Sequence, residues 1–181
     1  MKRLNFFVTL ILLVTFVSTT NAQLDPNYKG YYYLQTQFRG DAEMLESNGA
    51  ASKTMNGAAF MSTQKGATGQ QWKFVAEPGK PGFYRLKTLA GKDELCLEGN
   101  QMRGTYKNGV SVMMKCANVS GQLWKVEDAK NGFYRLITLF KGKEFCLEGN
   151  KAGGGAKDGN SFMDTRQNVS GQLWKLVKVT K

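Results

Sequence analysis

Three glutamates recur at one position of a repeated sequence string, and they are the chain's leading candidates for binding chemistry. Glu98 and Glu148 lie in two copies of Cys-Leu-Glu-Gly-Asn, and Glu46 lies in the looser copy Met-Leu-Glu-Ser-Asn. A carboxylate accepts hydrogen bonds, and an amide both donates and accepts them. An acid with an asparagine two residues later would suit the hydroxyl groups of a polyol, and the two such pairs are Glu98 with Asn100 and Glu148 with Asn150. Alternatively, these side chains only hold a turn by capping its backbone amides.

These glutamates belong to one of four sequence landmarks that recur in the same order in three copies. Gln-x-Trp begins at Gln70, Gln122 and Gln172, at spacings of 52 and 50 residues, and uses all three tryptophans. A Gly-aromatic-Tyr string opens each copy, and a glycine precedes each Gln-x-Trp by thirteen residues. This periodicity predicts one domain, residues 23–181, with repeats at about 30–76, 82–126 and 132–176.

Each copy predicts about four short strands and no helix. Tyr84 and Leu86 alternate with charged residues, which is the period-two pattern of a half-buried strand, and Gly-, Asn-, Lys- and Asp-rich turns separate such segments. Four strands alone leave open edges and a poor core, whereas three units can close around a pseudo-threefold axis. The expected fold is all-β with about twelve strands. The expected core residues, with each glutamine on the strand face of its tryptophan, are Gln70, Trp72, Gln122, Trp124, Gln172 and Trp174.

Catalysis has little support in the sequence. The chain contains no histidine, which removes the usual general base, the Ser-His and Cys-His nucleophilic pairs and the commonest metal ligand. A glycosidase-type pair of carboxylates is disfavoured because the three repeated glutamates fall in different repeats. We therefore expect no enzymatic activity, no catalytic residue, no cofactor and no bound metal.

The N-terminus predicts a secretory signal peptide over residues 1–22. Lys2 and Arg3 precede an apolar run of twelve residues, and Thr20-Asn21-Ala22 is a small-x-small cleavage pattern before Gln23. A membrane anchor is the alternative, but about 20 apolar residues are needed to span a bilayer. The expected location is extracellular or periplasmic, with no membrane span.

The chain is basic. Loss of residues 1–22, which contain two basic residues and no acid, would lower the net charge from +11 to +9. Such a balance fits nucleic acid, an anionic membrane or an acidic polysaccharide. Because the lysines are scattered singly, a solubilising surface is favoured over a polyanion groove, and export argues against a nucleic acid partner.

The repeat resembles that of the ricin-B-type β-trefoil lectin family. Three Gln-x-Trp copies at this period, each with a Cys-Leu-Glu-like string upstream, carry the resemblance over all of the chain except its ends. The resemblance implies a β-trefoil with a shallow sugar site on each repeat. In that family an aspartate after Cys-Leu, an aromatic two residues before a second cysteine and an asparagine before the Gln-x-Trp glutamine contact the sugar.

This sequence departs from the family pattern at each of those positions. The acids are the longer Glu46, Glu98 and Glu148; the stacking positions hold Ser62, Met114 and Asp164; and the asparagine positions hold Gly69, Gly121 and Gly171. The family's usual galactose site is therefore altered in all three copies. Substitutes from the sequence are Tyr106 as a stacking ring and Asp164 as a hydroxyl acceptor, although Asp164 also suits an ordinary surface charge.

The resemblance also implies which of the three cysteines form a disulfide. It implies a disulfide between Cys96 and Cys116, because the family's first cysteine pairs with a second about twenty residues later. Arg166 takes the place of Cys116 in the third repeat, so Cys146 is expected to be a buried, inert thiol.

Two functional hypotheses remain. The first is a secreted, non-enzymatic carbohydrate-binding module whose partners are glycans or polysaccharides. The second is a protein-binding trefoil, such as a protease inhibitor or adhesion module, in which the sugar sites are degenerate. The repeated acid and asparagine favour the first, and the missing stacking ring favours the second.

Overall fold

Twelve β-strands and five short 3-10 helices make up the secondary structure of the part of the chain that this computed structural model describes, residues 24–25, 27–47, 57–63, 65–99, 109–149 and 159–180. The expected all-β fold of twelve strands is confirmed. No helix among these residues has the length and apolar character needed to cross a membrane. The expected signal peptide, Asn100, Tyr106 and Asn150 lie outside the described residues.

Each repeat contributes four strands. Those of the first repeat are β1 (Tyr32–Thr36), β2 (Met44–Ser47), β3 (Ala59–Ser62) and β4 (Trp72–Ala76). Those of the second are β5 (Phe83–Thr88), β6 (Leu95–Glu98), β7 (Val112–Lys115) and β8 (Trp124–Asp128). Those of the third are β9 (Tyr134–Thr138), β10 (Phe145–Gly149), β11 (Ser161–Thr165) and β12 (Trp174–Lys178). The 3-10 helices are η1 (Gly40–Ala42), η2 (Thr68–Gln70), η3 (Ser120–Gln122), η4 (Gly142–Glu144) and η5 (Ser170–Gln172).

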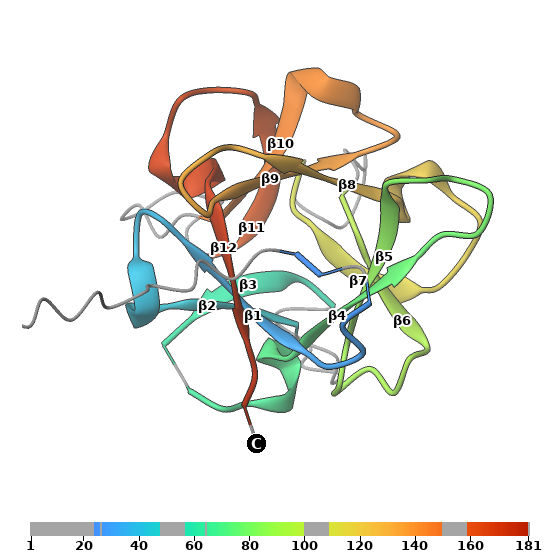
Figure 1. Cartoon of the computed structure of the whole chain (residues 1–181), viewed down its shortest axis with the longest axis horizontal. Coiled ribbons are helices and arrows are strands. Elements are labelled where there is room, and N and C mark those ends of the chain that lie inside the picture. The colour runs from blue at the N-terminus through green and yellow to red at the C-terminus, as the bar shows by residue number, and fades with distance from the viewer. Residues whose placement is uncertain are drawn as a thin grey trace, which may run out of the picture.

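The outer strands of the three repeats form a closed barrel. The last strand of each repeat pairs antiparallel with the first strand of the next, in β4–β5 and β8–β9, and β12 returns to pair with β1. Within each repeat the first and last strands also touch, at Tyr32–Trp72, Tyr84–Trp124 and Tyr134–Trp174. The repeats therefore surround a common centre (Figure 1) and leave no strand of the ring unpaired.

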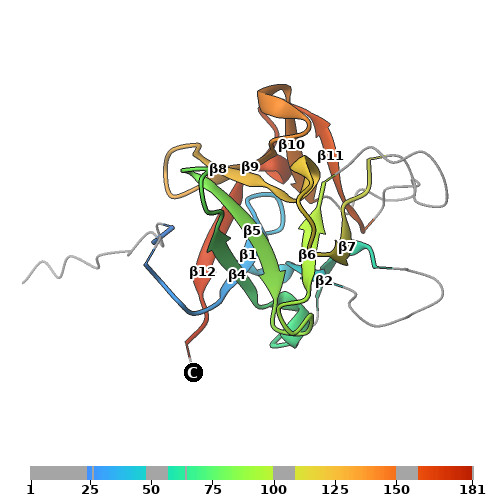
Figure 2. The ribbon, with the colours of Figure 1, turned by 90° about the vertical axis from the view of Figure 1, so that its right-hand side faces the viewer.

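The inner strands of each repeat form a hairpin, and the three hairpins cover one end of the barrel (Figure 2). They meet at three equivalent residues, Ala59, Ser111 and Ser161. The N–H of Ala59 donates to the carbonyl of Ser111 at 3.0 Å, the N–H of Ser111 donates to the carbonyl of Ser161 at 2.9 Å, and Oγ of Ser161 donates to the carbonyl of Ala59 at 3.0 Å. The buried polar groups are thus paired across the axis, which fixes the hairpins relative to one another.

The three tryptophans fill the centre of the core. All three are fully buried, and their Nε1 atoms donate 2.8 Å hydrogen bonds to the carbonyls of Leu45, Leu97 and Leu147. Each bond joins the last strand of a repeat to that repeat's own hairpin. The indole therefore supplies apolar volume and a directed link in every repeat, which explains why the Gln-x-Trp motif is needed three times.

The expectation that each glutamine shares a strand face with its tryptophan is wrong. Gln70, Gln122 and Gln172 end the 3-10 helices η2, η3 and η5, and the strands begin at the tryptophans. In η3 the N–H of Leu123 bonds to the carbonyl of Ser120, which closes a tight turn before the strand. That turn directs the glutamine side chain toward the hairpin.

Candidate functional site

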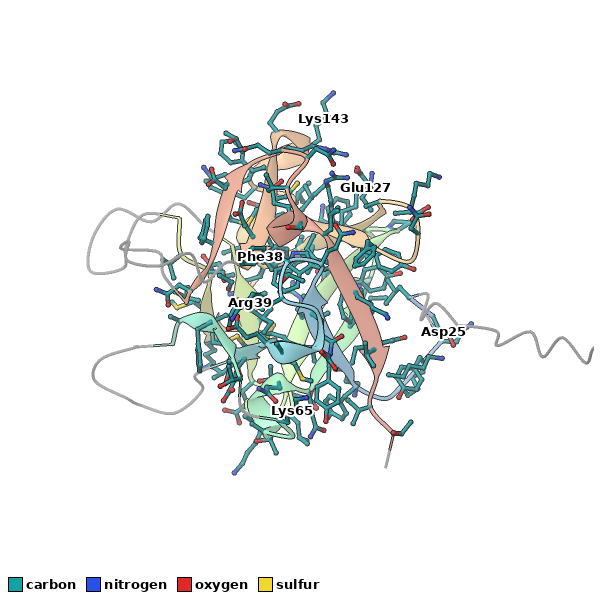
Figure 3. All side chains as sticks on the ribbon, turned by 90° about the vertical axis from the view of Figure 1, so that its left-hand side faces the viewer. Asp25, Phe38, Arg39, Lys65, Glu127 and Lys143 are labelled. Atoms are coloured by element: carbon teal, nitrogen blue, oxygen red, sulfur yellow. A yellow bond between two sulfur atoms is a disulfide. The ribbon has the colours of Figure 1, made fainter. Side chains whose placement is uncertain are left out.

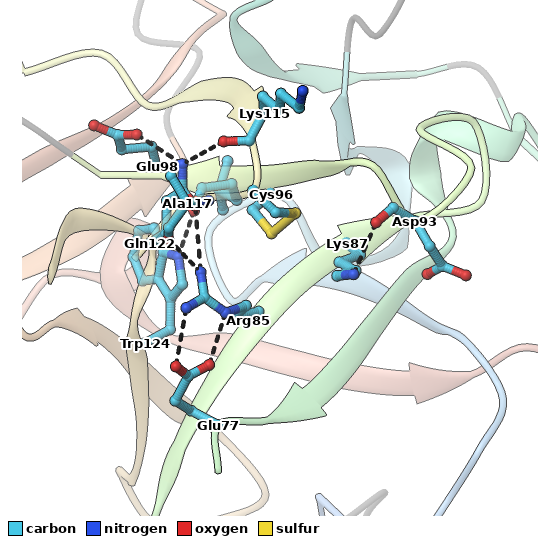
Figure 4. The surroundings of a disulfide bond; sticks show 12 residues. Glu77, Arg85, Lys87, Asp93, Cys96, Glu98, Lys115, Ala117, Gln122 and Trp124 are labelled. Atoms are coloured by element: carbon cyan, nitrogen blue, oxygen red, sulfur yellow. Dashed lines mark hydrogen bonds and ion pairs between the residues drawn. A yellow bond between two sulfur atoms is a disulfide. The ribbon is translucent and has the colours of Figure 1, made fainter. Parts of the chain in front are cut away.

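Gln122 holds the carboxylate of Glu98 at the end of strand β6. Its Nε2 donates to Oε2 of Glu98 at 3.0 Å and to the carbonyl of Lys115 at 3.1 Å, and its Oε1 accepts the N–H of Ala117 at 2.8 Å (Figure 4). Glu98 is buried, with 9% of its surface exposed. The amide thus uses its donors and its acceptor to fix one acid beside two backbone groups.

The third repeat reproduces this arrangement. Nε2 of Gln172 donates to Oε2 of Glu148 at 3.0 Å and to the carbonyl of Thr165 at 2.8 Å, and its Oε1 accepts the N–H of Gln167 at 2.8 Å. The first repeat is looser, because Nε2 of Gln70 lies 3.2 Å from Oε2 of Glu46, which is half-buried. The three candidate acids thus occupy equivalent positions in three separate lobes.

The glycine before each glutamine leaves room for the acid. A Cβ atom added at Gly121 would lie 3.2 Å from Cγ of Glu98, and one added at Gly171 would lie 3.2 Å from Cγ of Glu148. At Gly69 the added atom would come within 2.6 Å of the carbonyl oxygen of Ser47. A side chain at these positions, such as the family's asparagine, would crowd the acid or its strand.

The family's stacking positions carry no ring. Ser62, Met114 and Asp164 lie half-buried near the ends of β3, β7 and β11. The Oδ1 atom of Asp164 accepts the backbone N–H of Thr165 at 2.8 Å, so this carboxylate is used in part by its own strand. None of these three residues offers a flat apolar face to a sugar.

Arg85 supports the second-repeat site, and it was missed in the sequence. Its Nε and Nη2 donate to Glu77 at 2.7 and 2.9 Å, and its Nη1 donates to the carbonyl of Ala117 at 2.6 Å and lies 3.4 Å from Oε1 of Gln122 (Figure 4). The hydrogen bonds from Arg85 to Glu77 lower the pKa of the Glu77 carboxyl from its ordinary value of 4.5. The signal was present, because the same Phe-Tyr-Arg-Leu string recurs in the third repeat.

The predicted disulfide between Cys96 and Cys116 is confirmed. It links residues 20 apart and ties strand β6 to the segment after β7, directly beside Arg85 and Gln122 (Figure 4). The predicted free Cys146 is buried, and burial raises the pKa of its thiol to about 11. The thiol is therefore protonated at neutral pH and is a poor nucleophile.

Arg166 replaces the second cysteine in the third repeat and makes an ion pair instead. Its guanidinium bonds to Glu127, which raises the pKa of Arg166. Its backbone N–H bonds to the carbonyl of Glu144 at 2.8 Å, just as the N–H of Cys116 bonds to the carbonyl of Glu94 at 2.9 Å. The two repeats thus share a backbone geometry and stabilise it by different side-chain chemistry.

Solved structures of β-trefoil proteins are similar to this one. The designed 3-fold symmetric protein ThreeFoil is 22% identical with a TM-score of 0.64, covering 82% of this chain and 99% of that one. SeviL bound to asialo-GM1 saccharide is 22% identical with a TM-score of 0.59, covering 84% and 100%. The GlcNAcα1-4Gal releasing endo-β-galactosidase from Clostridium perfringens is 14% identical with a TM-score of 0.61, and 83% of this chain spans 33% of that enzyme. At these identities the similarities show the fold alone.

Sequence comparison identifies the family. No curated protein matches the chain. The profile described as "Ricin-type beta-trefoil lectin domain-like" matches residues 68–163, which is more than half of the chain and includes all of the second repeat. Together with the β-trefoil fold and the three Gln-x-Trp turns, this match shows that the chain belongs to the ricin-type β-trefoil lectin domain-like family.

Proposed function

We propose that this protein is a secreted, non-enzymatic carbohydrate-binding module. The observation that carries the proposal is the repeated pair of a glutamate and the Gln-x-Trp glutamine, best formed between Glu98 and Gln122 and between Glu148 and Gln172. In a lectin-like family, an acid held by an amide is suited to accept hydrogen bonds from sugar hydroxyls without first being ordered.

Several weak sites on one molecule fit this geometry. The glutamates occupy equivalent positions in three separate lobes, so the sites would bind separate sugars of one polymer. Linked sites gain affinity through effective concentration without any new contact. Expected ligands are therefore polysaccharides or clustered glycans rather than free monosaccharides.

Secretion is supported by the N-terminal sequence and by the disulfide between Cys96 and Cys116, since disulfides persist in oxidising compartments. Mass spectrometry of the protein from culture medium or periplasm should give a mature N-terminus at Gln23. Recovery of only the full chain in the cytoplasm would contradict this part of the proposal.

A glycan array tests the binding function. The full chain would be expressed with export so that the disulfide forms, and it would be applied at physiological salt to neutral, sialylated, uronate-containing and sulfated glycans, with asialo-GM1 saccharide included. Binding to one related set of sugars is the expected result. A blank array with folded protein would contradict the proposal.

The absence of aromatic residues at Ser62, Met114 and Asp164 favours a second candidate, a protein-binding trefoil. A blank array followed by capture of one defined protein partner would establish that alternative. The enzyme reading has no comparable support, because the acids of different repeats belong to separate lobes.

A further inference from the structure

Two exposed phenylalanines occupy equivalent turns of the first and third repeats. Among the described residues, the exposed large hydrophobic side chains are Phe38, Leu89, Val119, Leu139 and Phe140. The two aromatic members, Phe38 and Phe140, are 47% and 52% exposed, and each lies two residues after the end of its repeat's first strand. The second repeat has Ala90 at this position. Aromatic side chains, phenylalanine included, are enriched in binding interfaces relative to the rest of a protein surface.

The backbone of each phenylalanine is hydrogen-bonded to the preceding repeat. In the third repeat the N–H of Leu139 donates to the carbonyl of Leu123 at 2.8 Å, and the N–H of Phe140 donates to the carbonyl of Ser120 at 3.2 Å. Corresponding bonds of 2.8 and 3.3 Å join Gln37 to Leu173 and Phe38 to Ser170. The backbone that carries each phenylalanine is therefore held in place before any ligand arrives.

The turn that accepts a hydrogen bond from the backbone of each phenylalanine also holds a candidate acid. In η5, Ser170 accepts the bond from Phe38, Gly171 packs against Glu148, and Gln172 donates to Glu148. In η3, the corresponding residues link Phe140 to Glu98. One three-residue turn thus joins the ring of one repeat to the carboxylate of the repeat before it.

A cation accompanies each exposed ring. The guanidinium of Arg39 lies 5.8 Å from the centroid of Phe38 (Figure 3), and Nζ of Lys141 lies 5.7 Å from that of Phe140. Arg39 is also bonded to the buried Glu43 at 2.9 Å, and Lys141 also lies 4.5 Å from the centroid of Phe145. Each cation thus has a second partner besides its phenylalanine, and Phe38 and Phe140 stay about half exposed.

We propose that Phe38 and Phe140 are stacking platforms for the apolar face of a pyranose in two composite glycan sites. One site combines Phe38 with Glu148 across the boundary between the third and first repeats. The other combines Phe140 with Glu98 across the boundary between the second and third repeats. The next repeat thus supplies the rings that the second and third hairpins lack, whereas the boundary between the first and second repeats carries no platform. This inference rests on the proposed carbohydrate-binding function.

Variants compared on the same glycan array test the platforms. The double variant F38A/F140A keeps every charge, and both rings are exposed, so the fold should be retained. Its binding to the sugars that the unmodified protein recognises should fall by about fivefold or more, as expected for loss of aromatic anchors. F38Y/F140Y should restore the binding, because it keeps the ring. L89A is the matched control, since it removes an exposed apolar side chain from the second-repeat turn, and it should bind normally.

A gain of binding gives an independent check. A90F places a ring beside the turn η2, whose Gln70 is the partner of Glu46. This variant should bind a polyvalent glycan more strongly, because it gains a third site. Unchanged binding by F38A/F140A, in a protein that does bind the array, would overturn the platforms and leave the lectin function standing. A blank array for the unmodified protein would overturn both.

Discussion

Nε2 of Gln122 donates a 3.0 Å hydrogen bond to Oε2 of Glu98, and the same bond joins Gln172 to Glu148. In each case the partners are 24 residues apart and lie in one repeat. The Gln-x-Trp motif therefore has two separate tasks. The tryptophan enters the shared core, and the glutamine positions a largely buried acid at the end of a strand in its own lobe.

Truncation of a motif tryptophan should be strongly destabilising. W124A removes a fully buried indole and its hydrogen bond to Leu97. We expect a loss of about 3–5 kcal/mol in the free energy of unfolding, as for other buried aromatics. Urea denaturation would measure it, with V119A, a change at an exposed site, as the control. A loss below about 1 kcal/mol would show that the indole is not part of a packed core.

The glycines before the glutamines should differ in their tolerance to substitution. G69A brings a methyl group within 2.6 Å of the backbone carbonyl of Ser47, whereas at Gly121 the nearest atom is the side-chain Cγ of Glu98 at 3.2 Å. We expect G69A to cost about 1–3 kcal/mol and G121A to cost less, because a side chain moves more easily than a strand. Thermal unfolding of the two variants shows which substitution costs more stability. Equal losses would contradict this account of the two sites.

A second disulfide should form in the third repeat. The backbone at Arg166 matches that at Cys116, because each N–H donates to the carbonyl of the residue just before the first strand of its hairpin, so R166C should pair with the buried Cys146. Loss of the ion pair with Glu127 costs little at a surface, and the new link should add about 3 kcal/mol of stability.

Counting free thiols distinguishes R166C with the second disulfide from R166C without it. The unmodified protein should show no reactive thiol when native and one when denatured without reductant, since Cys146 is buried with a raised pKa of about 11. Oxidised R166C should show none in either state. Two thiols in denatured R166C would mean that the residues do not approach closely enough.

Stability should fall in acid partly through Glu77. Its pKa is lowered from 4.5 by hydrogen bonds from Arg85, so the folded state holds the charged form more strongly than the unfolded chain does. The resulting stabilisation is present above about pH 4.5 and is lost as the pH falls through the folded-state pKa. E77Q should therefore be less stable than the unmodified protein at neutral pH, and the difference should shrink in strong acid.

Melting temperatures at pH 7 and pH 3 test this linkage. D41N, which removes a charge from the exposed helix η1, controls for a general effect of net charge. A difference between E77Q and the unmodified protein that is the same at both pH values would exclude a role for the Glu77 charge.

The barrel could be predicted from the sequence because local and periodic sequence patterns determine it. Period-two strands, glycine-rich turns and three tryptophans in register lead directly to twelve strands around a common centre. The disulfide followed from the resemblance to a family in which that pair recurs. A small error in a predicted strand boundary changes none of these predictions.

The details of the site depended on geometry that periodicity does not encode. In the sequence each glutamine lies two residues before its tryptophan, which suggests that both belong to one strand face. A 3-10 turn instead places the glutamine outside the strand and directs its side chain to an acid 24 residues earlier. Phe38 and Phe140 belong to none of the four landmarks, and their exposure and contacts with the preceding repeat appear only when the barrel closes. An alignment of the turns after the first strands would have shown the two rings but not their neighbours.

The most direct test of the central claim is a calorimetric titration of the sugar bound best on the array into the unmodified protein and into E98Q/E148Q. Glutamine can still accept the bonds from Gln122 and Gln172, so the fold should persist, which equal melting temperatures would verify. We predict binding weaker by about tenfold or more, because an ionised acceptor is lost from the two best-formed sites. An unchanged Kd in the folded double variant would contradict the assignment of these glutamates to a sugar site.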